Sequence, residues 1–294
     1  MITEQIKETQ TAIKFHLDDQ NTNRDIYFIS DAHIGSWDKE SEAQKEKYLQ
    51  QFCQYLITIS PPPLLYIIGD LFDFWFEYRF AIPSVYQRLL TQLVVLRNHG
   101  VNIRYVTGNH DFWMRDFFPT YFGIDIYRGI HIVRLGMKSF YIFHGDGVLK
   151  EDQGYQLLKR VLQNPILIKA YQWLHPDIGI PIARWASAMS RSHYQKDAEI
   201  ERQDDEKYWA YAFEKLNLGY DYVLMGHTHR PVAITLGEKV YINLGDWISH
   251  FTFVRFDGHL LNLYQWNGNN NSTAIEKFTE ITKIQMETPA TIAE

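Results

Sequence analysis

The sequence of 294 residues predicts an α/β fold with a mainly parallel sheet. Short apolar runs recur along the chain, and each is followed by a polar or glycine-containing turn, a pattern typical of buried strands. Segments with helical periodicity separate the first three runs, and alternation of strands with helices favours parallel pairing. The five runs end at Ser30, Ile68, Val106, Phe143 and Met225.

The expected elements follow in chain order. Both helices carry apolar side chains on one face, for example Tyr48, Phe52 and Tyr55 in the first. We expect strands at Ile26–Ser30, Leu64–Ile68, Val101–Val106, Phe140–Phe143 and Tyr222–Met225, and helices at about 40–58 and 84–98.

The C-terminal part has a different pattern. Four strands joined by short turns predict antiparallel pairing, and hence a second sheet packed on the first. These strands are Val232–Leu236, Lys239–Asn243, Phe251–Phe256 and Leu260–Gln265.

The chain is expected to form one main domain with an insertion. Residues 25–266 are assigned to the domain, 1–24 to a polar N-terminal segment and 267–294 to a C-terminal tail. A helical stretch at about 150–200 interrupts the strand pattern and is rich in Ile, Leu and Trp. We interpret it as a helical cap inserted over the sheet edge.

Composition excludes several classes of protein. The net charge of −6, with dispersed Lys and Arg, argues against a nucleic-acid binder that uses a basic surface. The single cysteine, Cys53, excludes an internal disulfide framework. The sequence shows neither a signal-peptide pattern nor a run of about 18 apolar residues, so we expect a cytoplasmic protein.

Every strand of the first group is followed by residues that can bind a metal. Because the carboxyl ends of parallel strands form the binding crevice of such folds, we expect these residues to converge. In extended backbone, residues two apart project to the same side. Asp31 with His33, and His227 with His229, could therefore each present two ligands to one point. The clusters are Asp31-Ala32-His33, Gly69-Asp70, Gly108-Asn109-His110-Asp111, His144-Gly145 and Gly226-His227-Thr228-His229.

The clusters supply seven candidate ligands, which exceed the needs of one tetrahedral ion and suit two ions that share a carboxylate. Nitrogen and oxygen donors favour Mn, Fe, Zn or Co over calcium. Alone, each motif could be a solvated polar loop or a turn, but their joint occurrence behind five strands favours a metal site. The ligands are Asp31, His33, Asp70, Asn109, His144, His227 and His229.

These motifs, taken together and in this order, resemble the signature of the calcineurin-like metallophosphoesterase superfamily. The resemblance implies a four-layer α/β/β/α sandwich. It also implies two metal sites that share Asp70: one with Asp31, His33 and His229, and the other with Asn109, His144 and His227.

Within that superfamily the chain is most similar to the UDP-2,3-diacylglucosamine pyrophosphatases of lipid A biosynthesis. The best-known group of these enzymes has Arg where this chain has His110. The similarity implies a hydrolase that uses two divalent ions, with manganese expected, and produces UMP and 2,3-diacylglucosamine 1-phosphate. It rests on Gly69-Asp70-Leu71-Phe72-Asp73, His144-Gly145-Asp146, Asp152-Gln153-Gly154-Tyr155-Gln156, Gly226-His227-Thr228-His229-Arg230-Pro231 and Leu244-Gly245-Asp246-Trp247.

Three neighbouring residues are assigned to the chemistry itself. Two metals about 3.5–4 Å apart can lower the pKa of a water, while Asn109 and His110 neutralise charge on the transferring oxygens. His110 could instead protonate the leaving group, and Asp111 is expected to orient its ring. Asp73 and Asp146 are expected to support the metal ligands.

The cap is expected to bind the lipid and sugar parts of the substrate. Its apolar residues could line the acyl chains. Ordinary helix packing is the better explanation of any one of them, but a cap that is this apolar as a whole is better explained by a lipid ligand. Asp152 and Tyr155 match family residues near the sugar, and Arg184, Arg191, Ser192 and Lys196 could clamp phosphate or sugar groups or simply form a solvated helix end. A lipid substrate further suggests peripheral attachment to the inner membrane surface. The apolar residues are Ile166, Leu167, Ile168, Tyr171, Trp173, Leu174, Ile178, Ile180, Ile182 and Trp185.

Two alternatives remain open at this point. The first keeps the chemistry and changes the substrate to that of another phosphodiesterase, nucleotide pyrophosphatase or nuclease. The second is a non-catalytic interaction module, against which the complete ligand set argues.

Overall fold

Two β-sheets form the centre of the molecule. The computed structural model describes residues 24–36, 39–149, 164–183, 198–268 and 275–277. The first sheet has the order β12 (Ile275–Lys277), β11 (Leu261–Trp266), β10 (Thr252–Phe256), β1 (Ile26–Ile29), β2 (Leu64–Ile68), β3 (Asn102–Val106) and β4 (Asp125–Tyr127). The second has the order β5 (His131–Leu135), β6 (Lys138–Ile142), β7 (Tyr222–Met225), β9 (Lys239–Asn243) and β8 (Val232–Leu236).

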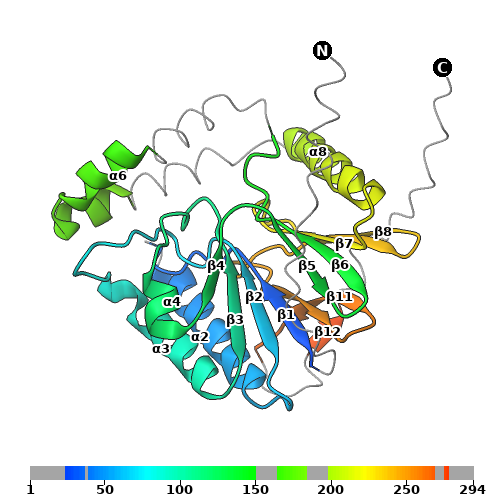
Figure 1. Ribbon diagram of the computed structural model, residues 1–294, viewed down its shortest axis with the longest axis horizontal. Helices are drawn as coiled ribbons and strands as arrows, with labels where there is room; N and C mark the ends of the chain where they lie inside the picture. Colours follow the sequence, from blue (N-terminus) through cyan, green and yellow to red (C-terminus); the bar gives the residue numbers. More distant parts are fainter. Residues whose placement is uncertain (1–23, 37–38, 150–163, 184–197, 269–274, 278–294) are drawn as a thin grey trace.

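Helices cover the outer face of each sheet, so the expected α/β/β/α sandwich is confirmed (Figure 1). On one side lie α2 (Lys39–Leu56), the 3₁₀ turn η2 (Ser84–Tyr86), α3 (Gln87–Asn98) and α4 (Phe117–Phe122). On the other side α8 (Ala198–Asn217) lies along β7 and β9.

Strand alternation explains why the apolar runs are continuous. In β1, Tyr27 and Ile29 face the helices α2 and α3, whereas Ile26 and Phe28 face the second sheet. A third core joins the second sheet to α8. Each central strand therefore buries both faces, which selects mainly apolar residues, with exceptions such as Arg104 in β3 and Arg255 in β10.

The assignment of strands to sheets differs from the expectation. The C-terminal strands do not form a separate second sheet: β10 and β11 join the first sheet, with β10 antiparallel to β1, while β8 and β9 join the second beside β7. The physical reason is that β10 is apolar on both faces. Phe253 packs toward the helices and Val254 between the sheets, a position that only a central strand can provide.

Three strands were not anticipated. The strands β4 and β12 have three residues each, and β5 carries polar residues that weaken its strand pattern. Residues 275–277 pair with β11, so the expected C-terminal tail contributes an edge strand.

The described part of the insertion, 164–183, is helical, as expected. The helix α6 (Pro165–Gln172) begins after Asn164, whose side chain accepts hydrogen bonds from the first backbone N–H groups, and has proline at its first position. A second helical run covers 176–183. Residues Asp152, Tyr155, Arg184, Trp185, Arg191, Ser192 and Lys196 lie outside the described residues.

Candidate metal centre

The structure brings the seven candidate side chains to one place, between the carboxyl ends of the two sheets. Asp31, Asp70 and Asn109 follow β1, β2 and β3 of the first sheet, while His144 follows β6 and His227 follows β7 of the second. The site therefore exists only when both sheets are packed together.

The donors fall into two groups. In the first, Asp31 Oδ1 lies 3.3 Å from His229 Nε2 and 3.7 Å from His33 Nε2. The second contains Asp70, His144 and His227, whose donor atoms lie within 4.8 Å of one another.

Asp70 lies between the two groups. Its Oδ2 atom is 3.7 Å from His33 Nε2 and 3.2 Å from His144 Nε2. His144 Nε2 is also 3.2 Å from Asn109 Oδ1. The arrangement gives Asp70 contact with both groups of donors.

The donor set fits divalent cations. Donors bound at about 2.1 Å to one ion lie roughly 3–3.5 Å apart, close to the separations found here. Asp31 Oδ1 and both ring nitrogens of His33 are buried without a hydrogen-bond partner, although buried polar atoms are normally paired. Cations would satisfy these atoms.

Most of the candidate ligands adopt the left-handed backbone conformation, which directs their side chains into the site. Five of the six non-glycine residues with positive φ in the described chain belong to the candidate set: Asp31 (54°), His33 (44°), Asp70 (52°), His227 (71°) and His229 (59°). The extended backbone assumed for the Asp-x-His and His-x-His pairs is therefore wrong. Such conformations cost of order 1–3 kcal/mol each and cluster at functional sites.

Two glycines permit close approach of backbone to the carboxylates. A Cβ atom at Gly108 would lie 2.1 Å from Asp70 Oδ1, and one at Gly226 would lie 2.3 Å from Asp31 Oδ2. Any side chain at these positions would displace a ligand.

Each carboxylate is fixed through one oxygen. Asp31 Oδ2 accepts hydrogen bonds from Ser30 Oγ and from the backbone N–H of His227 at 2.9 Å. Asp70 Oδ1 accepts from the backbone N–H of His110 at 2.9 Å. The other oxygen of each carboxylate faces the cluster.

Backbone carbonyls orient two of the imidazole rings. Nδ1 of His144 lies 2.9 Å from the oxygen of Ile68, and Nδ1 of His110 lies 2.7 Å from the oxygen of Asp73. Nδ1 therefore carries the proton in both rings, and Nε2 faces the site.

Asp111 has a different role from the expected one. Its buried carboxylate accepts from the backbone N–H groups of Gly108 at 2.7 Å and Leu71 at 3.1 Å, and from the hydroxyl of Tyr105. It thereby joins the loops that follow β2 and β3. The Nδ1 partner of His110 is instead the main-chain oxygen of Asp73, because the turn after Gly108 directs the two neighbouring side chains differently.

Burial and neighbouring charges shift the pKa values of the titratable groups in the site, so that Asp31 stays ionised while His33 and His227 stay neutral. Burial alone would raise the pKa of Asp31, but the charges of His144 and His229 outweigh it and hold that pKa well below its usual range. Burial lowers the pKa of His33 to about 3 and that of His227 to about 4. Two imidazoles of the cluster are therefore neutral and ready to bind a cation at neutral pH.

We expect manganese affinity to rise with pH. Burial opposes the charged form of His144 and of His229, but Asp70 and Asp31 raise the pKa of the first, and Asp31 raises that of the second. A cation must displace these protons, so binding should be at least roughly tenfold tighter at pH 8 than at pH 6.5 and should release protons. Titration with a pH indicator measures both quantities. An affinity independent of pH would contradict the expectation.

Lys45 supports the site and was missed by the sequence reasoning. Its buried ammonium donates to the main-chain oxygen of His33 at 2.7 Å and pairs with Glu42 at 2.9 Å. Glu42 in turn accepts from the backbone N–H of Gly35 at 2.6 Å. The helix α2 thus holds the loop that carries His33. A lysine on a helix face gives no sequence signal for such a role.

We expect Lys45→Met to destabilise the protein by about 3 kcal/mol, because it leaves Glu42 without its buried partner. Denaturant unfolding measures the change. Lys47→Met is the matched control, since Lys47 is exposed on the same helix and should change stability by less than about 0.5 kcal/mol. Equal effects of the two substitutions would refute a special role for Lys45.

Two further supports lie behind the second-sheet loop. Asn243 Nδ2 donates to the main-chain oxygen of Gly226 at 2.7 Å. Arg230 pairs with Asp205 of α8 at 2.7 Å. Both contacts fix the segment that carries His227 and His229, and both join residues too distant in sequence to be paired by inspection.

Comparison with known proteins places these features in a family. The family model for calcineurin-like phosphoesterases matches residues 25–231. The UDP-2,3-diacylglucosamine hydrolase of Porphyromonas gingivalis is 30% identical over 251 residues, covering 80% of this chain and 95% of that protein. Proteins of the same name are 26% identical in Proteus mirabilis (81% and 98% covered) and 28% identical in Haemophilus influenzae strain Rd (78% and 92% covered).

Proposed function

The chain belongs to the calcineurin-like phosphoesterase family and is a phosphoester or pyrophosphate hydrolase, and on that premise we propose that it cleaves the pyrophosphate bond of UDP-2,3-diacylglucosamine. The observation that carries the chemistry is the buried cluster in which Asp70 contacts both groups of donors. The substrate is supported by the relatives of that name, which align over nearly their whole length.

Two divalent cations are proposed as cofactors. Asp31, His33, Asp70 and His229 would hold one, and Asp70, Asn109, His144 and His227 would hold the other. When bound, such a pair activates water and neutralises charge on the phosphoryl oxygens. Manganese suits the mixed nitrogen and oxygen donors, as would Fe, Zn or Co.

The reaction adds water across one bond. The water oxygen attaches to the α-phosphorus, the bond from that phosphorus to the bridging oxygen breaks, and the bridging oxygen leaves with 2,3-diacylglucosamine 1-phosphate. The other product is UMP. Because Nδ1 of His110 donates to the oxygen of Asp73, Nε2 is the ring atom left for the phosphoryl group, and it donates a hydrogen bond there when the ring is protonated on both nitrogens.

The direct test is UMP release from UDP-2,3-diacylglucosamine by the manganese-loaded protein. Hydrolysis of bis(4-nitrophenyl) phosphate, a generic phosphodiester, is measured in parallel. Hydrolysis of the generic diester without UMP release would reject this substrate and favour another phosphodiesterase. Absence of both activities from protein that binds no metal would favour the non-catalytic interaction module.

The cap is proposed to bind the acyl chains and to attach the protein to the inner membrane surface. On its inner side Ile168, Tyr171 and Ile180 pack against Phe74 and Phe76 of the body. Packing against the body does not account for the other apolar residues of the cap, because their side chains are exposed. These residues are Ile166, Leu167, Trp173, Ile178 and Ile182. No helix in the described ranges has the length and apolar character needed to cross a bilayer.

We expect Trp173→Glu to weaken membrane binding by roughly tenfold or more, because the indole is 90% exposed and would lose its burial in lipid. Co-sedimentation with phosphatidylethanolamine and phosphatidylglycerol vesicles at low salt measures this. Met137→Glu is the control, since Met137 is equally exposed but lies in the β5–β6 turn, at the end of β6 opposite His144. If the unaltered protein stays in the supernatant, the membrane proposal fails.

A further inference from the structure

A cavity of about 250 Å³ adjoins the candidate metal centre. Gly108 forms part of its wall, and the contact of Gly108 with Asp70 places that wall directly beside the central carboxylate. Ile168 of α6 bounds the cavity toward the cap, and Phe112 and Trp113 line it. The cavity thus connects the reacting centre to the region proposed to hold the acyl chains.

Arg128 reaches this cavity from a strand end that the sequence reasoning overlooked. The edge strand β4 runs parallel to β3, with Tyr127 in register with Val106. The backbone N–H of Thr107 donates to the oxygen of Tyr127 at 2.9 Å. Arg128 therefore occupies the carboxyl end of β4, next to the loop that carries Asn109.

The guanidinium of Arg128 is positioned but not paired with an acid. Its Nη2 donates to the main-chain oxygen of Met114 at 2.6 Å. Among the described residues, no carboxylate lies within ion-pair distance of it, and no other cationic side chain lines the cavity.

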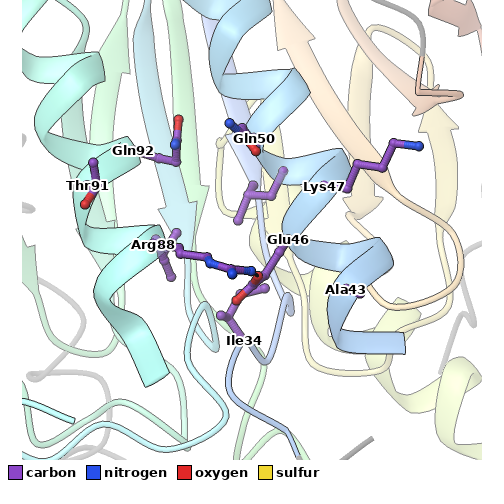
Figure 2. Close-up of a pocket in the computed structure, with 10 residues that line it drawn as sticks. Ile34, Ala43, Glu46, Lys47, Gln50, Arg88, Thr91 and Gln92 are labelled. Atoms are coloured by element: carbon purple, nitrogen blue, oxygen red, sulfur yellow. Dashed lines mark hydrogen bonds and ion pairs between the residues drawn. The ribbon is translucent and has the colours of Figure 1, made fainter. Parts of the chain in front are cut away.

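Arg88 shows the contrast. It lines a separate groove of about 420 Å³ between α2 and α3, where its guanidinium meets Glu46 at 2.8 Å (Figure 2). The positive charge of Arg88 is thus balanced within the protein, whereas that of Arg128 faces a cavity beside a phosphoryl-transfer centre.

We infer that Arg128 binds the phosphate that is not attacked, which is the one that leaves with the sugar; the inference rests on the proposed function. A diphosphate places its second phosphate one bridging oxygen away from the reacting phosphorus, and the cavity begins at the central carboxylate. A guanidinium donates two parallel hydrogen bonds to such a group. Arg128 would therefore select diphosphate substrates over single phosphodiesters.

The opposite charge in the cavity limits where that phosphate can lie. Asp146 is 7% exposed and lines the same cavity. Its carboxylate would repel a phosphate, but it can accept hydrogen bonds from sugar hydroxyl or amide groups. The cavity therefore suits a sugar phosphate, with the phosphate beside Arg128 and the sugar beside Asp146.

The experiment compares Arg128→Gln, Arg128→Lys and the control Arg88→Gln in the full-length, manganese-loaded protein. Values of kcat/KM are measured for UDP-2,3-diacylglucosamine and for bis(4-nitrophenyl) phosphate, which has one phosphate. A second readout is inhibition of the aryl diester reaction by UDP-N-acetylglucosamine and by UMP. Melting temperatures test folding, and the Lys variant keeps a donor for Met114.

We expect Arg128→Gln to lower kcat/KM for the diphosphate about 30-fold and to leave the aryl diester within about twofold of its original value. The inhibition constant for UDP-N-acetylglucosamine should rise about tenfold, while that for UMP stays constant. The Lys variant should show a smaller loss, since it keeps the charge without the bidentate geometry, and Arg88→Gln should show none.

Equal losses on both substrates, or no loss on the diphosphate, would overturn the inference. Failure of the unaltered protein to release UMP would instead reject the proposed substrate. In that case the two inhibition constants alone decide the role of Arg128.

Discussion

Asp70→Asn is expected to lower kcat/KM by roughly 10³-fold or more and to reduce bound manganese from two ions per chain to at most one. Asp70 Oδ2 is the atom that contacts donors of both groups. An amide in its place keeps the size of the side chain but removes the negative charge that two adjacent cations share. Activity assays and metal analysis on purified protein measure the two effects.

Asp116→Asn provides the matched control for this substitution. Asp116 is exposed, and its side chain makes no capping hydrogen bond at the start of α4. The same chemical change there should leave metal content and rate unaltered. Two full equivalents of manganese in Asp70→Asn would show that Asp70 does not bridge.

The convergence of the candidate metal ligands was predictable because their residue types are rare in combination and lie at strand ends. Asp31, Asp70 and Asn109 each follow a mainly apolar run, and such runs mark strands buried on both faces. Parallel strands present their carboxyl ends at one edge of the sheet. The convergence of these side chains could therefore be predicted from the order of the strands along the chain, without knowing to which sheet each strand belongs.

The division into two sheets could not be predicted in the same way. Continuous apolar runs look alike whether a strand lies in the first sheet, as β2 does, or in the second, as β7 does. The burial of both faces of β10 arises from contacts with α2 and with the second sheet. Those contacts form only when the layers pack together, so the sequence of β10 alone does not reveal them.

The local backbone conformation of the ligand residues also could not be predicted from the sequence pattern. Asp-x-His suggests an extended pair, yet Asp31 and His33 both adopt positive φ, because the backbone N–H of Asp31 bonds the oxygen of Gly69 and that of His33 bonds the oxygen of Asp70. The neighbouring loop therefore imposes the conformation. The same tertiary origin explains why the role of Asp111 was assigned incorrectly.

His110 is the residue whose chemical role the sequence left open between charge stabilisation and proton transfer. The leaving group proposed here is a sugar phosphate, and a phosphate ester with a second pKa near 6 leaves without needing a proton at neutral pH. With Nδ1 committed to the oxygen of Asp73, a proton on Nε2 makes the ring cationic. A cation at this position is suited to the charge on the phosphoryl oxygens, so we expect charge stabilisation.

His110→Gln should accordingly lower kcat by about 10²–10³-fold with little change in KM or metal content. The loss should be the same for UDP-2,3-diacylglucosamine and for bis(4-nitrophenyl) phosphate, because charge on the phosphoryl oxygens develops in both reactions. His110→Arg should recover most of the rate, since a guanidinium donates to those oxygens but cannot transfer a proton. If the loss instead grows with the pKa of the leaving group, and Arg fails to restore the rate, proton donation by Nε2 is the role of His110.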